Sequence, residues 1–550
     1  MRPLPVANLP VPVTRASAVR SRVAGRPEPP YDRLFDPLVD ELARGGPLAR
    51  ERFATLWTDT AALRELAEAK RAPLPASLAR ELTEYHVRLG ASERSLDALS
   101  RLARGEAVCA VSGQQPAPLG GPLYSLHKIA ATIGLGARVA ARTRVPCVAL
   151  FWMHAEDSDF AEIRHATVAD AALTLHDLAL PDAAHAEGGL VGGVPLAPLA
   201  ALERQALGHW DGLPGVGDVA TLLARAHERG RDLGEAFSAL ALALFAEQGL
   251  VVVDPRLPAF REAARPIIGR YLNRAAEVSA AARQAGDVME QRLGRRPLND
   301  AALESFVFLI EDGRRHKLSV AEALSGGAER TLSPSVSLRP AVQDGVFPTV
   351  AMAVGPGEAA YLAQLREVFE GLGVRPACAV PRFGATWLPR AAHELLEASG
   401  ADPWELVTGA DAVLRHFAES QVPAAVRGAL ERAHRGAMEG LVGYAEISRQ
   451  VDASLPQMVE SARAKVDYQF ARLLEGLTGK VRHRLERQHP EWVRLRYYLQ
   501  PGDKLQERRL ASLEPVAHRG LAVVGEVCDL AEAHAQALEH GRLEHVLADL

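Results

Sequence analysis

Cysteine is scarce in this sequence: four are present among 550 residues, and no two of them form a C-x-x-C pair. The spacing therefore gives none of the usual zinc motifs, and we expect no structural metal site. Cys109, Cys147 and Cys378 each lie in an apolar run. A free cysteine in such a run usually behaves as a small hydrophobic residue, so we expect no catalytic thiol. A reducing cytosol suits such a chain.

Long hydrophobic runs are also absent. No segment has the roughly 20 consecutive apolar residues that a transmembrane helix needs. Residues 1–30 are rich in Arg and Pro and lack the continuous apolar core of a signal peptide, so we expect an irregular arm on the body of the protein. The net charge of -5 is far from the basic excess of general nucleic-acid binders. These absences predict a cytoplasmic protein that has neither membrane nor nucleic acid as a partner.

The composition that remains is that of an ordinary globular protein. Hydrophobic residues make up 48% of the chain and charged residues 24%. Such a chain can bury a large core and is not expected to be disordered. At about 150 residues per domain, its length corresponds to roughly three or four units.

Two segments far apart in the sequence each have the pattern of a strand, a loop, a helix and a second strand. Apolar runs at residues 107–112 and 145–152 flank the first amphipathic helix, and runs at 348–354 and 377–380 flank the second. Each pattern is typical of a βαβ unit, whose crossover should be right-handed. We therefore predict an α/β fold in which both units contribute to one doubly wound parallel sheet.

The remaining segments are expected to surround this sheet or to extend from it. The predicted units are an N-terminal arm and helices packed on the core (1–105), the first half of the core (106–169), an inserted α/β connecting region (170–330), the second half of the core (331–389), an α-helical coiled coil (390–490) and a C-terminal segment that returns to the core (491–550).

The coiled coil is predicted from a narrow apolar stripe. Between Leu455 and Leu485 apolar residues recur at steps of three and four, while charged residues occupy the opposite positions. The segment 422–451 is expected to be an antiparallel helical partner. We expect the stripe to be buried against another helix, within the chain or across a dimer.

The first candidate site is the loop after the first strand, with SGQQ at residues 112–115 and LGGPLY at 119–124. Glycine lets backbone N–H groups approach a phosphate, and the following helix N-terminus adds partial positive charge. His127 and Lys128 follow within the first helical turns. The spacing matches neither G-x-G-x-x-G nor a P-loop. An ordinary tight turn with solvated His127 and Lys128 is therefore an equal alternative.

The second candidate site, HAEDSD at residues 154–159, follows the second strand. A carboxylate at the end of a strand can hold a substrate ammonium or act as a base toward an amine. Asp157, Ser158 or Asp159 could equally cap a helix. Histidine beside carboxylates also permits a metal ion, but no standard ligand spacing is present, so this alternative is the least favoured.

Two further candidate sites lie later in the chain. Arg339 precedes the loop GPGE at residues 355–358, which opens a helix containing Tyr361. Glu358 could simply complement the helix dipole there, which is worth about 0.3–1 kcal/mol. The segment 497–508 is rich in Tyr, Gln and Arg and could hold a nucleotide. From the spacing alone, an ordinary connection from the long helix back to the core is the favoured alternative.

Several of these segments together resemble the cysteine ligases of bacillithiol biosynthesis. The matching stretches occur in the same order from about Phe35 to the end of the chain; they are SGQQPAPLGGPLYSLHK, FWMHAEDSDFAEIRH, LSPSVSLRP, VGPGEAAYLAQLREVF, VPRF and KLQERRL. The resemblance implies a Rossmann-like core related to class I nucleotidyl-transferring ligases, inserted connecting regions and a coiled coil that mediates homodimerisation. It also implies the last step of bacillithiol biosynthesis, in which cysteine is joined to the amine of glucosaminyl-malate.

The sequence departs from the family pattern at several points. The histidine-rich tetrad usual in such nucleotidyl-transferring relatives is absent, although His127 and Lys128 lie where they place their first nucleotide-binding signature. Ser158 stands where the family usually has His, and Arg164 where it has Asn. These departures put conventional adenylation in doubt and leave open a sugar thiol other than bacillithiol.

The resemblance implies a reaction in which ATP activates the cysteine carboxylate, with Mg²⁺ as a candidate companion of ATP. The Gly113 and Gly357 loops would bind phosphates or the malate carboxylates. Lys128 and Arg339 would neutralise developing charge, and an aspartate would accept the proton of the amine. The candidate catalytic residues are Lys128, His127, Asp157 and Asp159. The candidate substrate- or nucleotide-binding residues are Ser112, Gly113, Gln114, Gln115, Tyr124, His154, Glu156, Arg339, Gly355, Gly357, Glu358, Tyr361, Gln506 and Arg508.

Two other classes of function remain open at this point. One is a different amide-forming or nucleotidyl-transferring enzyme on the same core. The other is a non-catalytic ligand-binding scaffold that uses the coiled coil. Substrate-dependent consumption of ATP would separate the enzymes from the scaffold, and the mass of the product would separate the two enzymes.

Overall fold

The computed structural model describes residues 22–24, 36–326, 330–452 and 454–550. Most of the arm expected at residues 1–30 lies outside these ranges. The chain divides into two compact units, which are Met1–Ala171, Leu175–Trp387 and Leu505–Leu550 for the first, and Ala172–Thr174 and Leu388–Lys504 for the second. Within the described ranges, no helix is both long and apolar enough to cross a membrane.

A five-stranded parallel sheet lies at the centre of the first unit, with the order β11-β10-β2-β3-β6. Its strands are β2 (Val108–Gln114), β3 (Cys147–Met153), β6 (Val251–Val253), β10 (Thr349–Val354) and β11 (Cys378–Pro381). Because β2 pairs with β10, the two halves predicted from the sequence share one sheet, and the predicted Rossmann-like fold is confirmed. Strand β6 joins this sheet from within the segment 170–330 that we expected to be an insertion.

The strand order reverses between β2 and β10, which is where ligands bind in open α/β sheets. From β2 the chain proceeds to β3 and β6 on one side, and later from β10 to β11 on the other. The strands are buried along almost their whole length, as expected when helices cover both faces of a parallel sheet. The loops that follow β2, β3 and β10 therefore meet at one edge.

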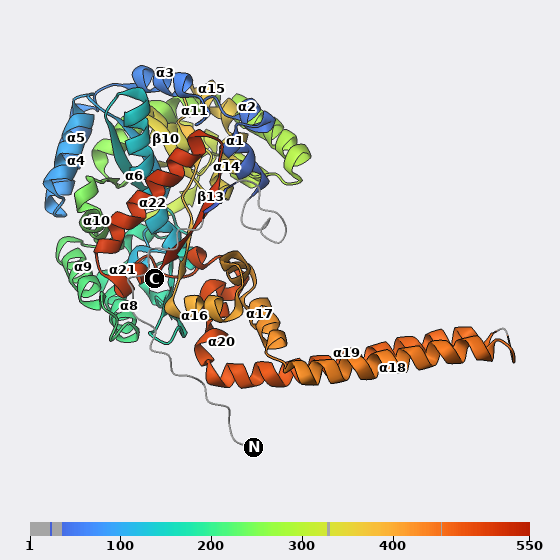
Figure 1. The fold of residues 1–550 in the computed structure, drawn as a ribbon. Coiled ribbons are helices and arrows are strands. Elements are labelled where there is room, and N and C mark those ends of the chain that lie inside the picture. Colours follow the sequence, from blue (N-terminus) through green and yellow to red (C-terminus); the bar gives the residue numbers. More distant parts are fainter. Residues whose placement is uncertain (1–21, 25–35, 327–329, 453) are drawn as a thin grey trace. The chain divides into compact units, whose positions relative to one another are not determined.

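The helix α6 (Leu123–Thr143) connects β2 to β3 and is buried on most of its sides. It packs on α22 (Ala522–Glu539), and Figure 1 shows the two helices side by side. Gly134 permits this close packing, because a Cβ atom there would lie 2.7 Å from the backbone nitrogen of Glu532. The single helix expected between β10 and β11 is instead two helices, α14 (Pro356–Gln364) and α15 (Arg366–Leu372), with a break at Leu365.

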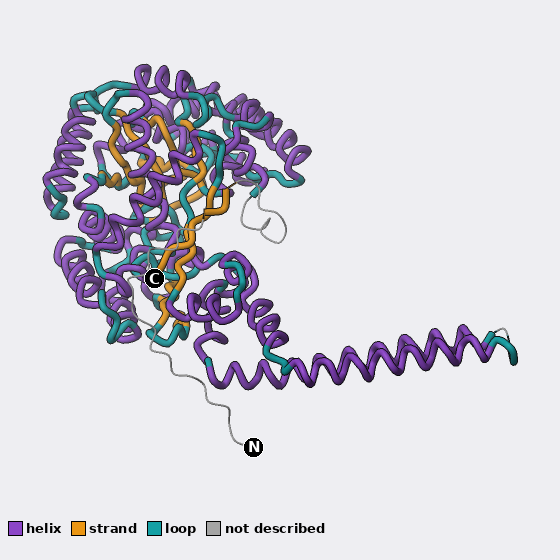
Figure 2. Tube along the Cα trace, in the orientation of Figure 1, coloured by secondary structure: helices purple, strands orange, loops and turns teal. Residues whose placement is uncertain are grey.

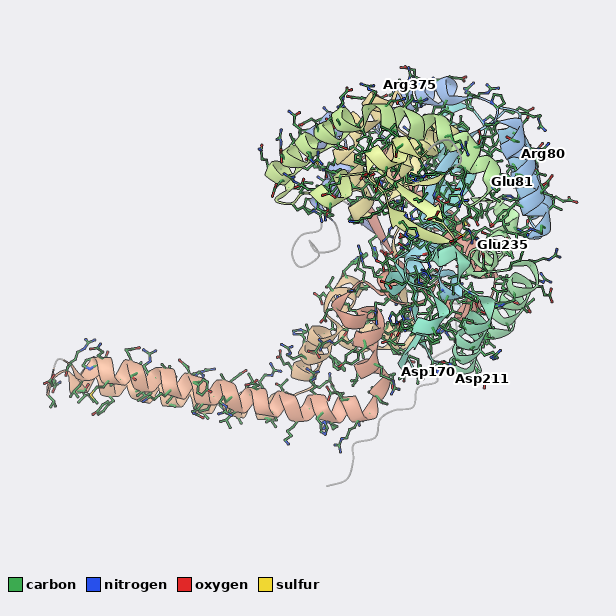
Figure 3. All side chains as sticks on the ribbon, turned by 180° about the vertical axis from the view of Figure 1, so that it is seen from behind. Arg80, Glu81, Asp170, Asp211, Glu235 and Arg375 are labelled. Atoms are coloured by element: carbon green, nitrogen blue, oxygen red, sulfur yellow. The ribbon has the colours of Figure 1, made fainter. Side chains whose placement is uncertain are left out.

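Among the described residues before the sheet, five helices are present: α1 (Pro37–Arg44), α2 (Pro47–Arg52), α3 (Thr60–Lys70), α4 (Ala76–Arg88) and α5 (Glu93–Ala103). One ion pair and one hydrogen bond hold α4 in the first unit, and Figure 3 labels two of the residues involved, Glu81 and Glu235. Glu235 on α10 (Leu233–Leu244) pairs with Arg88, and Glu81 accepts a hydrogen bond from the N–H of Ala259 near the start of α11 (Pro258–Leu293).

The connecting region between β3 and β10 contains two small antiparallel sheets and several helices. One sheet pairs β4 (His165–Ala169) with β5 (Leu175–Ala179), and the other has the order β8-β7-β9. The strands of the second are β7 (Val307–Glu311), β8 (Arg314–Lys317) and β9 (Thr331–Pro334). Asp312 and Gly313 join β7 to β8 and both have positive φ. This is the geometry of a tight two-residue hairpin, for which Asp-Gly is a preferred sequence.

The C-terminal segment contributes to the first unit. Gln506 lies in a short 3-10 helix (Gln506–Arg508), and its buried amide bonds both the N–H and the C=O of Trp387. The final strand β13 (Glu544–Asp549) lies between β1 (Arg22–Ala24) and β12 (Ala385–Leu388). The hydrogen bonds of Gln506 therefore attach the C-terminal segment to the core.

The second unit is helical, and its main feature is a long hairpin of α18 (Ala424–Ser448) and α19 (Leu455–Gln488), shown in Figure 2. The predicted coiled coil is confirmed, and the partner of α19 lies within the same chain. Val459, Val481 and Leu485 are buried. Leu473 of the stripe remains 58% exposed within the single chain, so burial of this part of the stripe across a dimer stays a prediction.

Candidate functional site

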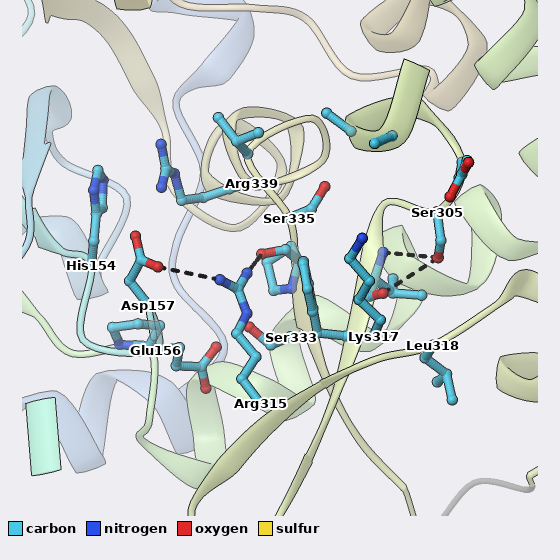
Figure 4. Close-up of a pocket in the computed structure, with 18 of the residues that line it drawn as sticks. His154, Glu156, Asp157, Ser305, Arg315, Lys317, Leu318, Ser333, Ser335 and Arg339 are labelled. Carbon is cyan, nitrogen blue, oxygen red and sulfur yellow. Dashed lines mark hydrogen bonds and ion pairs between the residues drawn. The ribbon is translucent and has the colours of Figure 1, made fainter. Parts of the chain in front are cut away.

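A cavity of about 510 Å³ lies beyond the end of β3, within the first unit (Figure 4). Ligand sites typically have about 300–1,000 Å³, so the cavity can hold a small substrate. One wall comes from the parallel sheet and its loops, including His154, Asp157 and Arg339. A second wall comes from the β8-β7-β9 sheet, including Arg315 and Lys317. The site therefore combines the predicted strand-end loops with a sheet from the connecting region.

His154 lies at the junction of β2, β3 and the cavity. Strand β2 continues beyond Ser112, and the backbone N–H of His154 donates to the carbonyl oxygen of Gln114. A Cβ atom at Gly113 would lie only 2.6 Å from Nε2 of His154 and 2.8 Å from the carbonyl oxygen of Trp152. Gly113 thus lets the imidazole pack against β2, whereas the sharp turn expected at this glycine is not present.

The imidazole of His154 is held in its neutral form. Burial lowers its pKa well below the usual value, and the positive charges of Arg339, Lys128 and Arg315 lower it further. Among the described residues, none forms a hydrogen bond with the His154 ring. The lowered pKa makes this imidazole a weak base, but it can still accept the proton of an amine nitrogen that has become acidic by attacking an acyl group.

The two predicted catalytic aspartates have different surroundings. Asp157 lines the cavity, where Oδ1 accepts the N–H of Ser158 at 2.7 Å and Oδ2 accepts a hydrogen bond from Gln115 at 3.0 Å. Asp159 is exposed and caps the short helix α7 (Phe160–Ile163) by accepting the N–H of Glu162. The geometry therefore places Asp157 at the site and gives Asp159 the capping position that the sequence left open.

Glu156 also lines the cavity, but an ion pair occupies its carboxylate. Arg261 on α11 donates to Oε1 of Glu156 at 2.7 Å. Burial raises the pKa of Glu156, and the charge of Arg261 opposes that rise. This pair fixes the wall of the cavity beneath Asp157.

Lys128 is buried at the end of β2, so the alternative in which it is solvated is wrong. Its Nζ donates to the carbonyl oxygen of Gly113 at 2.8 Å and to Oε1 of Gln114 at 3.1 Å, and it forms an ion pair with Glu358 at 2.9 Å. Burial lowers the pKa of Lys128, and the charge of Glu358 opposes this. Lys128 thus joins the loops after β2 and β10.

The carboxylate of Glu358 lies at the start of α14, where the sequence suggested that a phosphate could bind. Its Oε2 accepts the N–H of Gly355 at 2.9 Å at the start of α14 and also contacts Lys128. A Cβ atom at Gly357 would meet nothing within 4 Å, so this glycine is not required by close packing. The other glycine turn, at Gly121, is covered by the chain itself, because its carbonyl accepts the N–H of Ser512.

His127 lies in the core and does not line the cavity, so its solvated alternative is also wrong. Nδ1 is 2.9 Å from Oε2 of Glu507, and Nε2 accepts the indole N–H of Trp387 at 3.3 Å. Arg382 completes the network through two contacts with the Glu507 carboxylate. Burial lowers the pKa of His127 although Glu507 opposes this. The geometry favours a structural role for His127.

The remaining candidates form the surroundings of Lys128 and Arg339. Gln114 donates to the hydroxyl of Tyr124 at 3.1 Å, and burial raises the pKa of Tyr124 to about 12. The hydroxyl of Ser112 donates to the carbonyl oxygen of Lys128. Arg339 donates to the hydroxyl of Tyr361 at 3.3 Å. Arg508 is exposed and lies near enough to Tyr124 for its charge to oppose that rise in pKa.

Sequence reasoning missed the cations of β8. Arg315 and Lys317 line the cavity from the segment RRHK, which lies well outside every loop singled out above. Ser333 and Ser335, which also line the cavity, lie within the family-like stretch LSPSVSLRP but were not singled out. The Asp-Gly turn could have revealed the hairpin, but strand alternation alone does not say which face of β8 meets the core.

Comparisons with known proteins agree with this architecture. A family model described as the N-terminal Rossmann-like domain of bacillithiol biosynthesis BshC matches residues 33–383, and the model of the C-terminal coiled-coil domain matches residues 385–543. A relative from Solibacter usitatus is 32% identical over 461 residues, which cover 79% of this chain and 84% of the relative.

Two further relatives come from Koribacter versatilis and Geobacillus kaustophilus. The relative from Koribacter versatilis is 29% identical, and the match covers 81% of this chain and 85% of that relative. The relative from Geobacillus kaustophilus is 28% identical, and the match covers 78% of this chain and 83% of that relative. All three carry the name "Putative cysteine ligase BshC". The family resemblance drawn from the six sequence stretches is confirmed: this chain belongs to the bacillithiol biosynthesis BshC family.

Proposed function

We propose that this protein is a cytoplasmic ligase that joins the carboxyl group of cysteine to the amine of glucosaminyl-malate, at the expense of ATP. Family membership and the name of the relatives support the reaction class. The observation that carries the proposal is the cavity at the strand ends, which brings the imidazole of His154 together with Arg315 and Arg339. That imidazole forms no hydrogen bond with the described residues, and burial lowers its pKa. Such a site suits an amine nucleophile and an activated carboxyl group.

ATP is proposed because a carboxylate is a poor electrophile at neutral pH. Transfer of a phosphoryl or adenylyl group to the cysteine carboxylate creates a leaving group. The amine nitrogen then attacks the carbonyl carbon, and the phosphate or AMP departs with the electron pair of the C–O bond. The proton lost by the amine passes to His154, which replaces the aspartate base expected from the sequence.

Arg339 is the proposed stabiliser of the negative charge that develops during this step. Its one side-chain hydrogen bond among the described residues goes to the neutral hydroxyl of Tyr361. Lys128 is less suited to that role, because Glu358 already neutralises it. Within the described ranges, no group of three or more His, Cys, Asp or Glu side chains could hold a metal ion. Mg²⁺ would accordingly arrive with the phosphates of ATP.

The direct test incubates the purified protein with ATP, cysteine and glucosaminyl-malate. We expect ATP consumption that requires both other substrates, and a product with the mass of their amide. Chromatography of the nucleotides will show whether AMP or ADP forms. Consumption of ATP with a different amine would favour another amide-forming enzyme, and no consumption with any amine would favour the scaffold.

Asp157→Asn is expected to lower the rate of amide formation by about tenfold to a hundredfold, the usual worth of a hydrogen bond to a charged group. Asparagine keeps an oxygen that can accept the N–H of Ser158, but it loses the charge facing Arg315 at 3.6 Å. The matched control is Asp159→Asn, which makes the same change on the exposed α7 cap. Equal rates for the two variants would show that Asp157 acts only as a structural cap.

We also propose a homodimer formed through the helical hairpin of α18 and α19. The hairpin keeps large apolar side chains exposed, including Tyr468 at 58% and Leu473 at 58%. Because the hairpin consists of two helices, it contains no further helix that could cover these exposed side chains. Leu473→Glu is expected to convert a dimer into a monomer in light-scattering measurements, whereas Glu475→Lys, which changes an exposed position on the opposite side of α19, should leave the mass unchanged. A wild-type monomer would contradict the proposal.

A further inference from the structure

Strand β8 presents two positive charges to the cavity. The side chains of successive residues in a strand point to opposite faces, so Arg315 and Lys317 share one face and Arg314 and His316 share the other. Arg315 and Lys317 line the cavity, and Arg314 does not. The short hairpin turn at Asp312 and Gly313 sets this register.

Arg315 is held rigidly and retains unused hydrogen-bonding capacity. Its guanidinium lies 3.8 Å from the centre of the Phe308 ring, and Nη2 donates to the carbonyl oxygen of Pro334 at 3.1 Å. Nη1 lies 3.6 Å from Asp157, which is too long for a good hydrogen bond (Figure 4). Nε is buried and has no hydrogen-bond partner. Nε has almost no accessible surface, so the donor available to a ligand is Nη1, whose contact with Asp157 is long.

Lys317 supplies a second cation from the next position on the same face. Its side chain is exposed toward the cavity, and no ion pair or hydrogen bond to it is formed by the described residues. A rigid guanidinium beside a mobile ammonium suits a ligand with two negative groups. Arg315 has a carboxylate partner in Asp157, but that ion pair is longer, at 3.6 Å, than the 2.9 Å pair of Lys128 with Glu358.

The acidic side chains of the cavity, one of which is the ion-pair partner of Arg315, indicate which anion fits. Asp157 and Glu304 also line the cavity, and they would repel the dense negative charge of a triphosphate. A ligand with an amine at one end and carboxylates at the other matches both walls. The amine would face His154 and Asp157, and the carboxylates would face β8. The acceptor in the proposed function carries this combination of groups.

We propose that Arg315 and Lys317 form a dicarboxylate subsite that binds the malate part of the acceptor and selects it over sugars without carboxylates. This inference rests on the proposed function and assigns the β8-β7-β9 sheet as the acceptor-selecting wall. The planar guanidinium of Arg315 can donate paired hydrogen bonds to one carboxylate. The flexible side chain of Lys317 can bring its positive charge to the second carboxylate.

The test compares two acceptors, glucosaminyl-malate and methyl glucosaminide, which lacks both carboxylates. For Lys317→Ala, the KM for glucosaminyl-malate should rise by about tenfold to a hundredfold, while the KM values for ATP and cysteine stay unchanged. The variant should use methyl glucosaminide as poorly as the wild type does. Arg315→Lys keeps the positive charge but removes the planar guanidinium, and it should likewise raise the KM for glucosaminyl-malate alone.

The matched control is Arg314→Ala, which removes one positive charge from the other face of the same strand and should leave all three KM values unchanged. A rise in the KM for ATP with Lys317→Ala would overturn the proposal in favour of a phosphate subsite. Equal behaviour of Lys317→Ala and Arg314→Ala would also overturn it.

Calorimetry separates failure of the subsite from failure of the proposed function. If the wild type forms no product, the ligase proposal fails, but titration with glucosaminyl-malate still decides the subsite. Binding by the wild type that is lost in Lys317→Ala and kept in Arg314→Ala supports the dicarboxylate subsite. Absence of binding to the wild type, or equal binding of glucosaminyl-malate and methyl glucosaminide, overturns it.

Discussion

Replacing His154 with glutamine is expected to slow amide formation by about 10²- to 10⁴-fold, the usual contribution of a positioned general base. Glutamine is polar and of similar size, so it can occupy the space beside Gly113, but it cannot accept a proton at neutral pH. Substrate binding should change little, because Arg315, Lys317 and Arg339 remain. Single-turnover measurements, together with circular dichroism to verify folding, test this expectation.

The dependence of the rate on pH distinguishes a base from a merely structural histidine. Burial and the nearby charges of Arg339, Lys128 and Arg315 hold the pKa of His154 well below its usual value. The imidazole therefore stays unprotonated through pH 6.5, and the wild-type rate should fall only at more acidic pH. His154→Gln should lack this acidic limb. A variant with the full rate, or with the same acidic limb as the wild type, would exclude His154 as the base.

Glu507→Gln is expected to lower the free energy of unfolding of the first unit by about 3–5 kcal/mol, the usual cost of removing one partner of a buried ion pair. Glu507 is fully buried and contacts both Arg382 and His127. Glutamine leaves the charge of Arg382 without its counter-ion. Chemical denaturation measures the loss, and Glu106→Gln, at a fully exposed ion pair with Arg104, should leave the transition unchanged.

The same network predicts the acid stability of the protein. Burial alone would raise the pKa of Glu507, but the charge of Arg382 and the hydrogen bond with His127 outweigh it and hold the pKa well below its usual range. The folded-state pKa is therefore lower than the unfolded-state value of about 4.3. The stabilisation is complete above that value and is lost as the pH falls through the folded-state pKa. Glu507→Gln should flatten this part of the stability curve, and an unchanged curve would contradict the assignment.

The amino-acid sequence alone predicted which segments form the strands of the central sheet. Apolar runs of strand length, each ending in glycine or a polar loop, predicted β2, β3, β10 and β11, because buried parallel strands need apolar residues on both faces. The heptad-like stripe predicted the helical hairpin, since its period follows directly from helix geometry. The grouping of the loops after β2, β3 and β10 was likewise predictable, because parallel strands end at one edge.

Only the tertiary structure decided what each side chain at that edge does. His127 and Lys128 are adjacent in sequence, yet one faces Glu507 in the core and the other faces Glu358. Adjacent residues on a helix point about 100° apart, and the packing of α22 and the C-terminal segment, remote in sequence, fixes those directions. The position of Arg315 in the cavity has the same cause. The hairpin of β7 and β8 forms locally, but the strands of the parallel sheet, which are distant in sequence, determine which face of that hairpin lines the cavity.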